Sequence, residues 1–215
     1  MKQEDGTVAV SIGENGIATF SYGSNLSFEG TGVTPYYASS VSEGTVNLTP
    51  MTTTWGWQGY ILKGDPGIYY VPTVDDEHAQ YPAQPNYLMQ MVNGGNVDAS
   101  TSETFHYIFA KKGDDASSIG FYRLTANHTL GAHKAYLETT EDITPDTSGN
   151  APSGNAPSIM LDFGGGTTAI MDVFQDEMKQ QPIQEDGVYY TLQGTRVQNP
   201  TKGLYILNGK KIIVK

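Results

Sequence analysis

Short runs in which apolar and polar residues alternate recur along most of the chain. Such runs predict half-buried β-strands, and the Gly, Pro, Asn and Asp residues between them predict turns. The predicted strands cover residues 8–12, 17–22, 35–38, 45–48, 59–63, 68–72, 104–110, 120–124 and 134–138. Their near-regular spacing favours a β-sandwich or barrel over alternating strands and helices.

Turn signals refine this pattern. Asn15-Gly16 predicts a two-residue hairpin between the first two strands. The segment 64–67 contains Pro66 and predicts a tight turn. Residues 73–86 are polar and interrupted by prolines, so we expect a long loop there. Together these signals predict an antiparallel sandwich-like domain over residues 7–140.

The composition changes after residue 140. The run 148–152, Ser-Gly-Asn-Ala-Pro, is almost repeated at 153–157, and such a tract predicts a linker or flexible loop over 141–158. A strand at 159–163 then opens a C-terminal module that we expect to span residues 159–215. A helix at 169–181 is the weakest of these predictions, because its apolar positions follow no clear helical period.

The last residues predict two hairpins. Strands at 188–192 and 196–197 flank Gln193-Gly194-Thr195, and strands at 203–207 and 210–214 flank Asn208-Gly209. Two successive hairpins predict a small antiparallel β-meander. The fold class predicted for the whole chain is therefore all-β.

Charge is distributed unevenly over the 215 residues, whose net charge is −11. The segment 187–215 holds five basic residues and no acidic one, which leaves seven basic and 23 acidic residues in the preceding part. An acidic body argues against nucleic acid as a partner. The absence of cysteine excludes disulfides and thiol catalysis, and no apolar run is long enough to predict a transmembrane segment. The first residues lack the apolar stretch of a signal peptide, so if the protein is exported, we expect this sequence to be a mature part of it.

The C-terminal sequence resembles a known family. Its matching positions are Tyr189, Leu192, Gln193, Gly194, Arg196, Gly203, Tyr205, Asn208, Gly209, Lys210 and Lys211. In their order they resemble the C-terminal sorting domains of type IX secretion in Bacteroidetes. The resemblance implies a secreted or outward-facing outer-membrane protein. It also implies that these residues are recognised by secretion or surface-anchoring machinery.

The preceding region resembles a domain that often accompanies this terminus in larger surface proteins. The similar stretches are residues 59–72, 120–124 and 130–137. This second resemblance implies no particular biochemical activity.

Aromatic residues offer a candidate binding site. Trp55, Trp57 and Tyr60 could stack on the apolar faces of sugar rings, with Gly56 allowing the backbone to present both indoles. The alternative is that the i, i+2 spacing on a strand places both tryptophans in the core. Solvent exposure of the two rings separates these readings.

Catalytic and metal-binding signals are weak. The acidic clusters at 75–77 and 114–115 could hold Ca²⁺, but neither has the spacing of a known calcium loop, and solvated surface charge is the preferred interpretation. We expect no cofactor, no metal and no enzymatic activity. The predicted function is a non-catalytic surface module. The alternatives are a carbohydrate-binding module and, third, a glycosidase whose carboxylates meet only in space.

Overall fold

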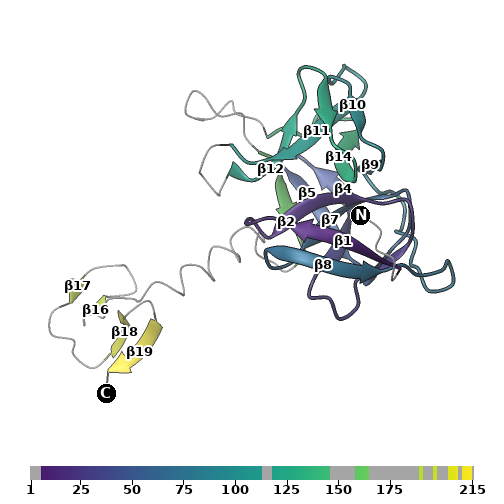
Figure 1. Ribbon diagram of the computed structural model, residues 1–215. Coiled ribbons are helices and arrows are strands. Elements are labelled where there is room, and N and C mark those ends of the chain that lie inside the picture. The colour runs from purple at the N-terminus through teal and green to yellow at the C-terminus, as the bar shows by residue number, and fades with distance from the viewer. Residues whose placement is uncertain are drawn as a thin grey trace. The chain divides into compact units, whose positions relative to one another are not determined.

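The computed structural model describes residues 6–112, 118–145 and 158–164, together with the backbone of four strands nearer the C-terminus. The chain divides into two compact units, Met1–Val173 and Phe174–Lys215. The regular elements of the described residues are all β-strands (Figure 1). The all-β prediction is confirmed. Residues 146–157 of the linker predicted at 141–158, the helix expected at 169–181 and the acidic pair at 114–115 lie outside the described residues. Residues 141–145 of the predicted linker are described, and Ile143 is buried in the core of the first unit, so this part is not a linker.

Two sheets facing each other form the body of the first unit. The larger sheet has the order β15-β5-β4-β7-β2 and the smaller the order β12-β11-β14-β9. The bounds of the larger sheet are β15 (Met160–Asp162), β5 (Thr45–Pro50), β4 (Thr34–Ser42), β7 (Gly59–Lys63) and β2 (Ile17–Ser21). Those of the smaller sheet are β12 (Gly120–Arg123), β11 (Phe105–Ala110), β14 (Lys134–Thr139) and β9 (Leu88–Met91). Apolar side chains of both sheets meet in one core cluster that includes Val46, Ile61, Tyr107, Phe121 and Leu137.

The two sheets are also joined at their edges. On one side, Phe121 of β12 and Ile159 exchange both backbone hydrogen bonds, with N–O distances of 3.1 and 2.9 Å. On the other side, the Ser21 hydroxyl of β2 accepts from the N–H of Met91 on the edge strand β9 at 3.2 Å and donates to the carbonyl of Lys134 at 2.7 Å. Sheets closed in this way leave few strand edges open.

A two-stranded ribbon folds back over the outer face of the larger sheet. β1 (Thr7–Ile12) pairs with β8 (Gly67–Pro72), and the same two chain segments continue as the β2–β7 pair. The register changes by one residue between the two pairs, from Ile12↔Gly67 to Ile17↔Lys63. An extra residue of this kind bends a ribbon sharply. Val8, Val10 and Val71 then pack against Phe20 and Leu62, which buries a second apolar cluster.

The hairpin predicted at Asn15-Gly16 is wrong. The turn forms, since the N–H of Gly16 donates to the carbonyl of Gly13 at 3.0 Å, but β1 and β2 pair with β8 and β7 instead of with each other. The local turn signal was correct, yet burying both strands against a shared core outweighs a simple hairpin. In Figure 1 the larger sheet lies between the β1–β8 pair and the smaller sheet.

Four short strands complete the first unit. β3 (Leu26–Ser27) pairs with β6 (Thr53–Thr54), and β10 (Gly95–Val97) pairs with β13 (His128–Leu130). Between β8 and β9 the structure has no strand over residues 74–87, which agrees with the predicted long loop.

The boundary expected at residue 159 differs from the structure. β15 pairs in parallel with β5, and both Ile159 and Leu161 are buried in the core of the first unit. A parallel pairing between strands far apart in the chain leaves no turn signal in the sequence. The strand at 159–163 was found correctly, but it belongs to the sandwich and not to the C-terminal module.

The second unit contains a four-stranded antiparallel sheet. Its strands are β16 (Tyr189–Tyr190), β17 (Arg196–Val197), β18 (Gly203–Leu207) and β19 (Lys210–Val214). Both predicted hairpins are present, as β16–β17 and β18–β19. The strand order is β17-β16-β18-β19, so β16, not β17, contacts the second hairpin. This order departs from the sequential order of a meander.

Candidate functional site

The Trp55-Gly56-Trp57 turn between β6 and β7 is held in place at three consecutive N–H groups. That of Trp55 donates to the Tyr60 hydroxyl at 2.8 Å, and that of Gly56 donates to the Asn25 side-chain carbonyl at 2.7 Å. The N–H of Trp57 donates to the carbonyl of Tyr22 at 2.7 Å. The turn is therefore fixed by two parts of the fold, strand β7 through Tyr60 and the segment between β2 and β3 through Tyr22 and Asn25.

Trp57 has an unusual backbone conformation and an exposed indole. Its φ is 60°, which places a bulky residue in the left-handed region, and its side chain is 52% exposed. Such a conformation costs about 1–3 kcal/mol and persists only where the surroundings impose it. The indole lies against the backbone of Gly23, where an added Cβ would be 3.4 Å from the ring. The backbone conformation that holds this large apolar ring at the surface therefore lowers the stability of the fold.

Tyr60 does not belong to a ligand-contacting surface. Its ring is 1% exposed, and its hydroxyl donates to the carbonyl of Trp55 as well as accepting from the N–H of that residue. Burial raises the pKa of the Tyr60 hydroxyl. The predicted contact role of Tyr60 is therefore wrong: this side chain positions Trp55. Both tryptophans lie in a turn and not on a strand, so the i, i+2 argument for core packing does not apply to them.

Tyr81 joins this site from the long loop after β8. Its ring packs edge-on against Trp55, with centroids 5.6 Å apart and an interplanar angle of 72°. Tyr81 is 51% exposed, and the side-chain amide of Gln58 donates to its hydroxyl over 3.4 Å. Sequence reasoning missed Tyr81 because it stands in an irregular, proline-rich segment without periodicity. We call Trp55, Trp57 and Tyr81 the aromatic surface.

Hydrogen bonds tie the loop of Tyr81 to the turn. The Asn25 amide, whose carbonyl holds Gly56, donates to a carboxylate oxygen of Asp76 at 2.7 Å. The N–H of Gln80 donates to the Thr53 hydroxyl at 2.7 Å. Asn25 thus links both segments that carry the aromatic rings.

Asp75, in the acidic cluster of the same loop, forms a hydrogen bond with a histidine. The ring of His78 contacts the Asp75 carboxylate, and this hydrogen bond holds the pKa of Asp75 below its usual value. Within the described part of the chain, no group of three or more His, Asp or Glu side chains is arranged to hold a metal ion. The structure gives no support to a calcium site in this loop.

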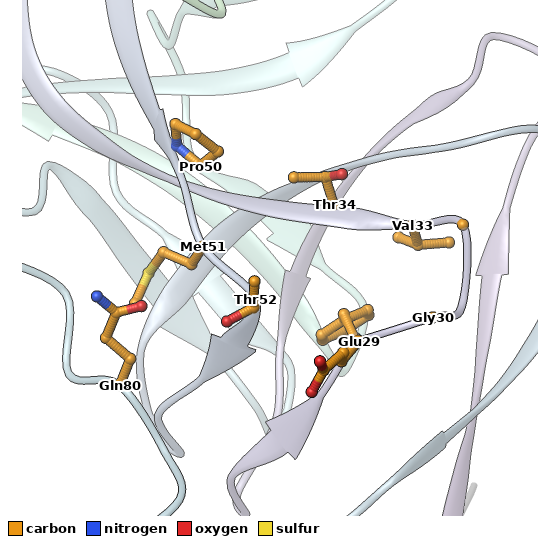
Figure 2. Close-up of a pocket in the computed structure, with 10 residues that line it drawn as sticks. Glu29, Gly30, Val33, Thr34, Pro50, Met51, Thr52 and Gln80 are labelled. Atoms are coloured by element: carbon orange, nitrogen blue, oxygen red, sulfur yellow. The ribbon is translucent and has the colours of Figure 1, made fainter.

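A pocket begins one residue from Tyr81 (Figure 2). It encloses about 500 Å³, and its lining includes Thr34, Met51, Thr52 and Gln80. A volume of this size is typical of sites for small ligands. In Figure 2 Gln80 and Met51 lie at one end of the pocket, and Glu29 and Val33 lie at the other.

Glu29 is the one carboxylate among the residues that line this pocket. Glycoside hydrolysis generally uses two carboxyl groups about 5–9.5 Å apart. The pocket therefore offers polar and apolar contacts for binding but lacks the acid–base pair of that chemistry.

The residues predicted for export or attachment lie in the second unit. Six of them stand on its strands: Tyr189, Arg196, Gly203, Tyr205, Lys210 and Lys211. The other five lie outside the described residues: Leu192, Gln193, Gly194, Asn208 and Gly209. The backbone pairing brings Tyr189 opposite Leu207, and Leu207 opposite Lys210. Strands from both halves of the motif thus share one sheet.

Comparisons with models of protein families, with curated proteins and with solved structures find no match to this chain. Among the described residues, no helix is long and apolar enough to cross a membrane.

Proposed function

We propose that this chain is a non-catalytic module of an exported bacterial surface protein, in which the second unit is the element recognised by export or attachment machinery. The observation that carries the proposal is the separation of residues 174–215 as a compact unit with its own antiparallel sheet. Its last 29 residues, 187–215, carry five basic side chains and no acidic one, in contrast to the acidic chain before them. The resemblance of these residues to type IX sorting domains supports the same role.

Recognition would use the sheet edges and the basic hairpin. β17 and β19 stand at the two ends of the sheet order, so one edge of each pairs with no other described strand. An edge strand can bind a partner by adding a strand, with main-chain hydrogen bonds giving affinity and side chains giving specificity. Lys210 and Lys211 open β19 and supply positive charge beside one such edge.

A secretion assay tests this proposal. A periplasmic reporter enzyme fused ahead of residues 174–215 is expressed in a Bacteroidetes host with an active type IX system, and in a strain of that host lacking the system. We expect reporter activity on the surface or in the medium of the first strain, and retention in the periplasm of the second.

Two further fusions serve as controls. A reporter without residues 174–215 should remain in the periplasm of both strains. A fusion with Lys210→Ala and Lys211→Ala should reach the surface less efficiently while its cellular amount stays the same. Equal surface activity with and without residues 174–215 would exclude an export or attachment role for the second unit.

A further inference from the structure

We infer that the aromatic surface of the first unit is a binding site for neutral polysaccharide. This inference does not depend on the role proposed for the second unit. It rests on an exposed ring held by a strained backbone, a second exposed ring from another segment, and amide side chains at the neighbouring positions 58 and 80. Each of these features has a chemical counterpart in a sugar chain.

The turn is organised before any ligand arrives. The N–H groups of residues 55–57 donate to the Tyr60 hydroxyl, the Asn25 side-chain carbonyl and the backbone carbonyl of Tyr22. Gly56 is required at its position, because an added Cβ would lie 2.9 Å from the carbonyl oxygen of Gly23. A surface fixed in this way loses little conformational entropy on binding.

The rings match the apolar faces of pyranoses. Trp57 and Tyr81 are each about half exposed, while the Tyr81 ring is braced edge-on by Trp55. Tyr and Trp are enriched at binding interfaces, because each combines a large apolar ring with a polar O–H or N–H group. Stacking on a sugar ring covers the ring faces and leaves the equatorial hydroxyls free for hydrogen bonds.

Amide side chains can meet those hydroxyls. Gln58 follows Trp57 in the chain and its side-chain amide donates to the Tyr81 hydroxyl, and Gln80, which precedes Tyr81, lines the pocket. An amide offers both donors and acceptors, as a hydroxyl does, so the two are complementary. The pocket of about 500 Å³ beside Gln80 would accept the next sugar residue of the polysaccharide.

Charge selects a neutral ligand. Between Lys2 and Lys111 the sequence has a single Lys or Arg, Lys63, while residues 75–77 on the loop of Tyr81, next to His78, are all acidic. An anionic glycan needs cationic partners to offset its desolvation. The surroundings of the aromatic surface would instead repel it.

The test is affinity gel electrophoresis of the full chain in gels containing soluble β-glucan, xylan or galactomannan, with polygalacturonate as the anionic polymer. We expect at least one neutral polymer to retard the protein and polygalacturonate to leave it unretarded. Failure of all three neutral polymers to retard the chain, or stronger retardation by polygalacturonate, overturns the inference.

Variants locate the contact. Trp57→Ala and Tyr81→Ala should each weaken binding by about tenfold, since each removes one stacked ring. The matched control is Tyr70→Ala, which removes an aromatic ring that is 60% exposed on β8. It should bind as the parent does. Equal loss in all three variants would indicate non-specific adhesion and contradict the site. Circular dichroism of each variant checks that the fold is kept.

Discussion

Among single residues, Tyr60 shows how a buried hydroxyl positions a turn at the surface, because it bonds to the backbone of Trp55. Replacing it with phenylalanine keeps the buried ring but leaves the N–H of Trp55 without its acceptor at 2.8 Å. A buried donor without a partner costs about 1–3 kcal/mol. We expect Tyr60→Phe to lower the free energy of unfolding by about 1–2 kcal/mol in urea titrations. Tyr70→Phe, at a ring 60% exposed, serves as control and should change it by less than about 0.5 kcal/mol. No difference between the two variants would contradict the positioning role.

Asp142 gives the molecule a pH-dependent contact. Burial acts to raise the pKa of its carboxyl, but hydrogen bonds from Thr144 and Tyr107 and the charge of Arg123 outweigh it, so the pKa is lowered from 3.8. The stability that follows is present above pH 3.8 and is lost as the pH falls through the lower pKa of the folded state. Since the side chain is 35% exposed, solvent screening keeps this contribution to about 1 kcal/mol or less.

Asp142→Asn should therefore be less stable than the parent at about pH 7, and the difference in unfolding free energy should shrink below about pH 4. Urea unfolding at a series of pH values measures this difference. A difference that stays constant across the series would show that the Asp142 contacts do not depend on its charge.

The sequence predicted the two tryptophans as candidate site residues, but it did not predict which side chains surround them. The motif Trp-Gly-Trp is visible in the sequence, and the exposure of Trp57 shows that this ring is not packed in the core. Tyr60 was misassigned because local spacing does not reveal which rings point inward. Tyr81 was missed because its contact with Trp55 depends on Asn25 and Gln80, which join segments that are distant in sequence.

At the scale of elements, alternation of apolar and polar residues predicted most of the longer strands but not their partners. The alternating residues 8–12 and 17–22 became strands β1 and β2, as expected. Their pairing failed because the ribbon bends at a one-residue shift in register, which no local pattern encodes. The parallel β5–β15 pair was missed because a pairing between strands far apart in the chain leaves no turn signal in the sequence.

Close approach of strands from the two sheets makes one glycine indispensable. A Cβ on Gly59 of β7 would lie 2.5 Å from the carbonyl oxygen of Leu88 on β9, and that oxygen belongs to paired backbone. Gly59→Ala should therefore lower the free energy of unfolding by about 2–3 kcal/mol, because the strands must move apart. Thermal and urea unfolding measure the loss.

Gly13→Ala is the matched control for this substitution. A Cβ at Gly13 would meet no atom within 4 Å, so the change should be within about 0.5 kcal/mol. If Gly59→Ala proved as stable as Gly13→Ala, the two sheets could not be packed as closely as the structure describes.

For the whole molecule, the sequence predicted a division into two units, but it did not predict the residue at which they are divided. The composition around the Ser-Gly-Asn-Ala-Pro repeat predicted that the first domain ends at residue 140 and that a linker covers residues 141–158. The compact unit instead extends to Val173, because β15 returns to the larger sheet and also bonds to β12 through Ile159. Composition marks a change in local structure, whereas a domain boundary depends on long-range contacts.

Two truncations test that boundary. A chain that ends at residue 173 keeps β15 and should unfold in urea with the same cooperativity and midpoint as the first unit of the full chain. A chain that ends at residue 157 lacks Ile159 and Leu161, which are 1% and 0% exposed in the core. Removing large buried side chains costs about 2–5 kcal/mol each, and the backbone bonds to Phe121 and β5 are lost as well. We expect the shorter chain to be at least about 4 kcal/mol less stable or to fail to fold. Equal midpoints for the two truncations would show that β15 lies outside the cooperative unit. The first unit would then end at the Ser-Gly-Asn-Ala-Pro repeat.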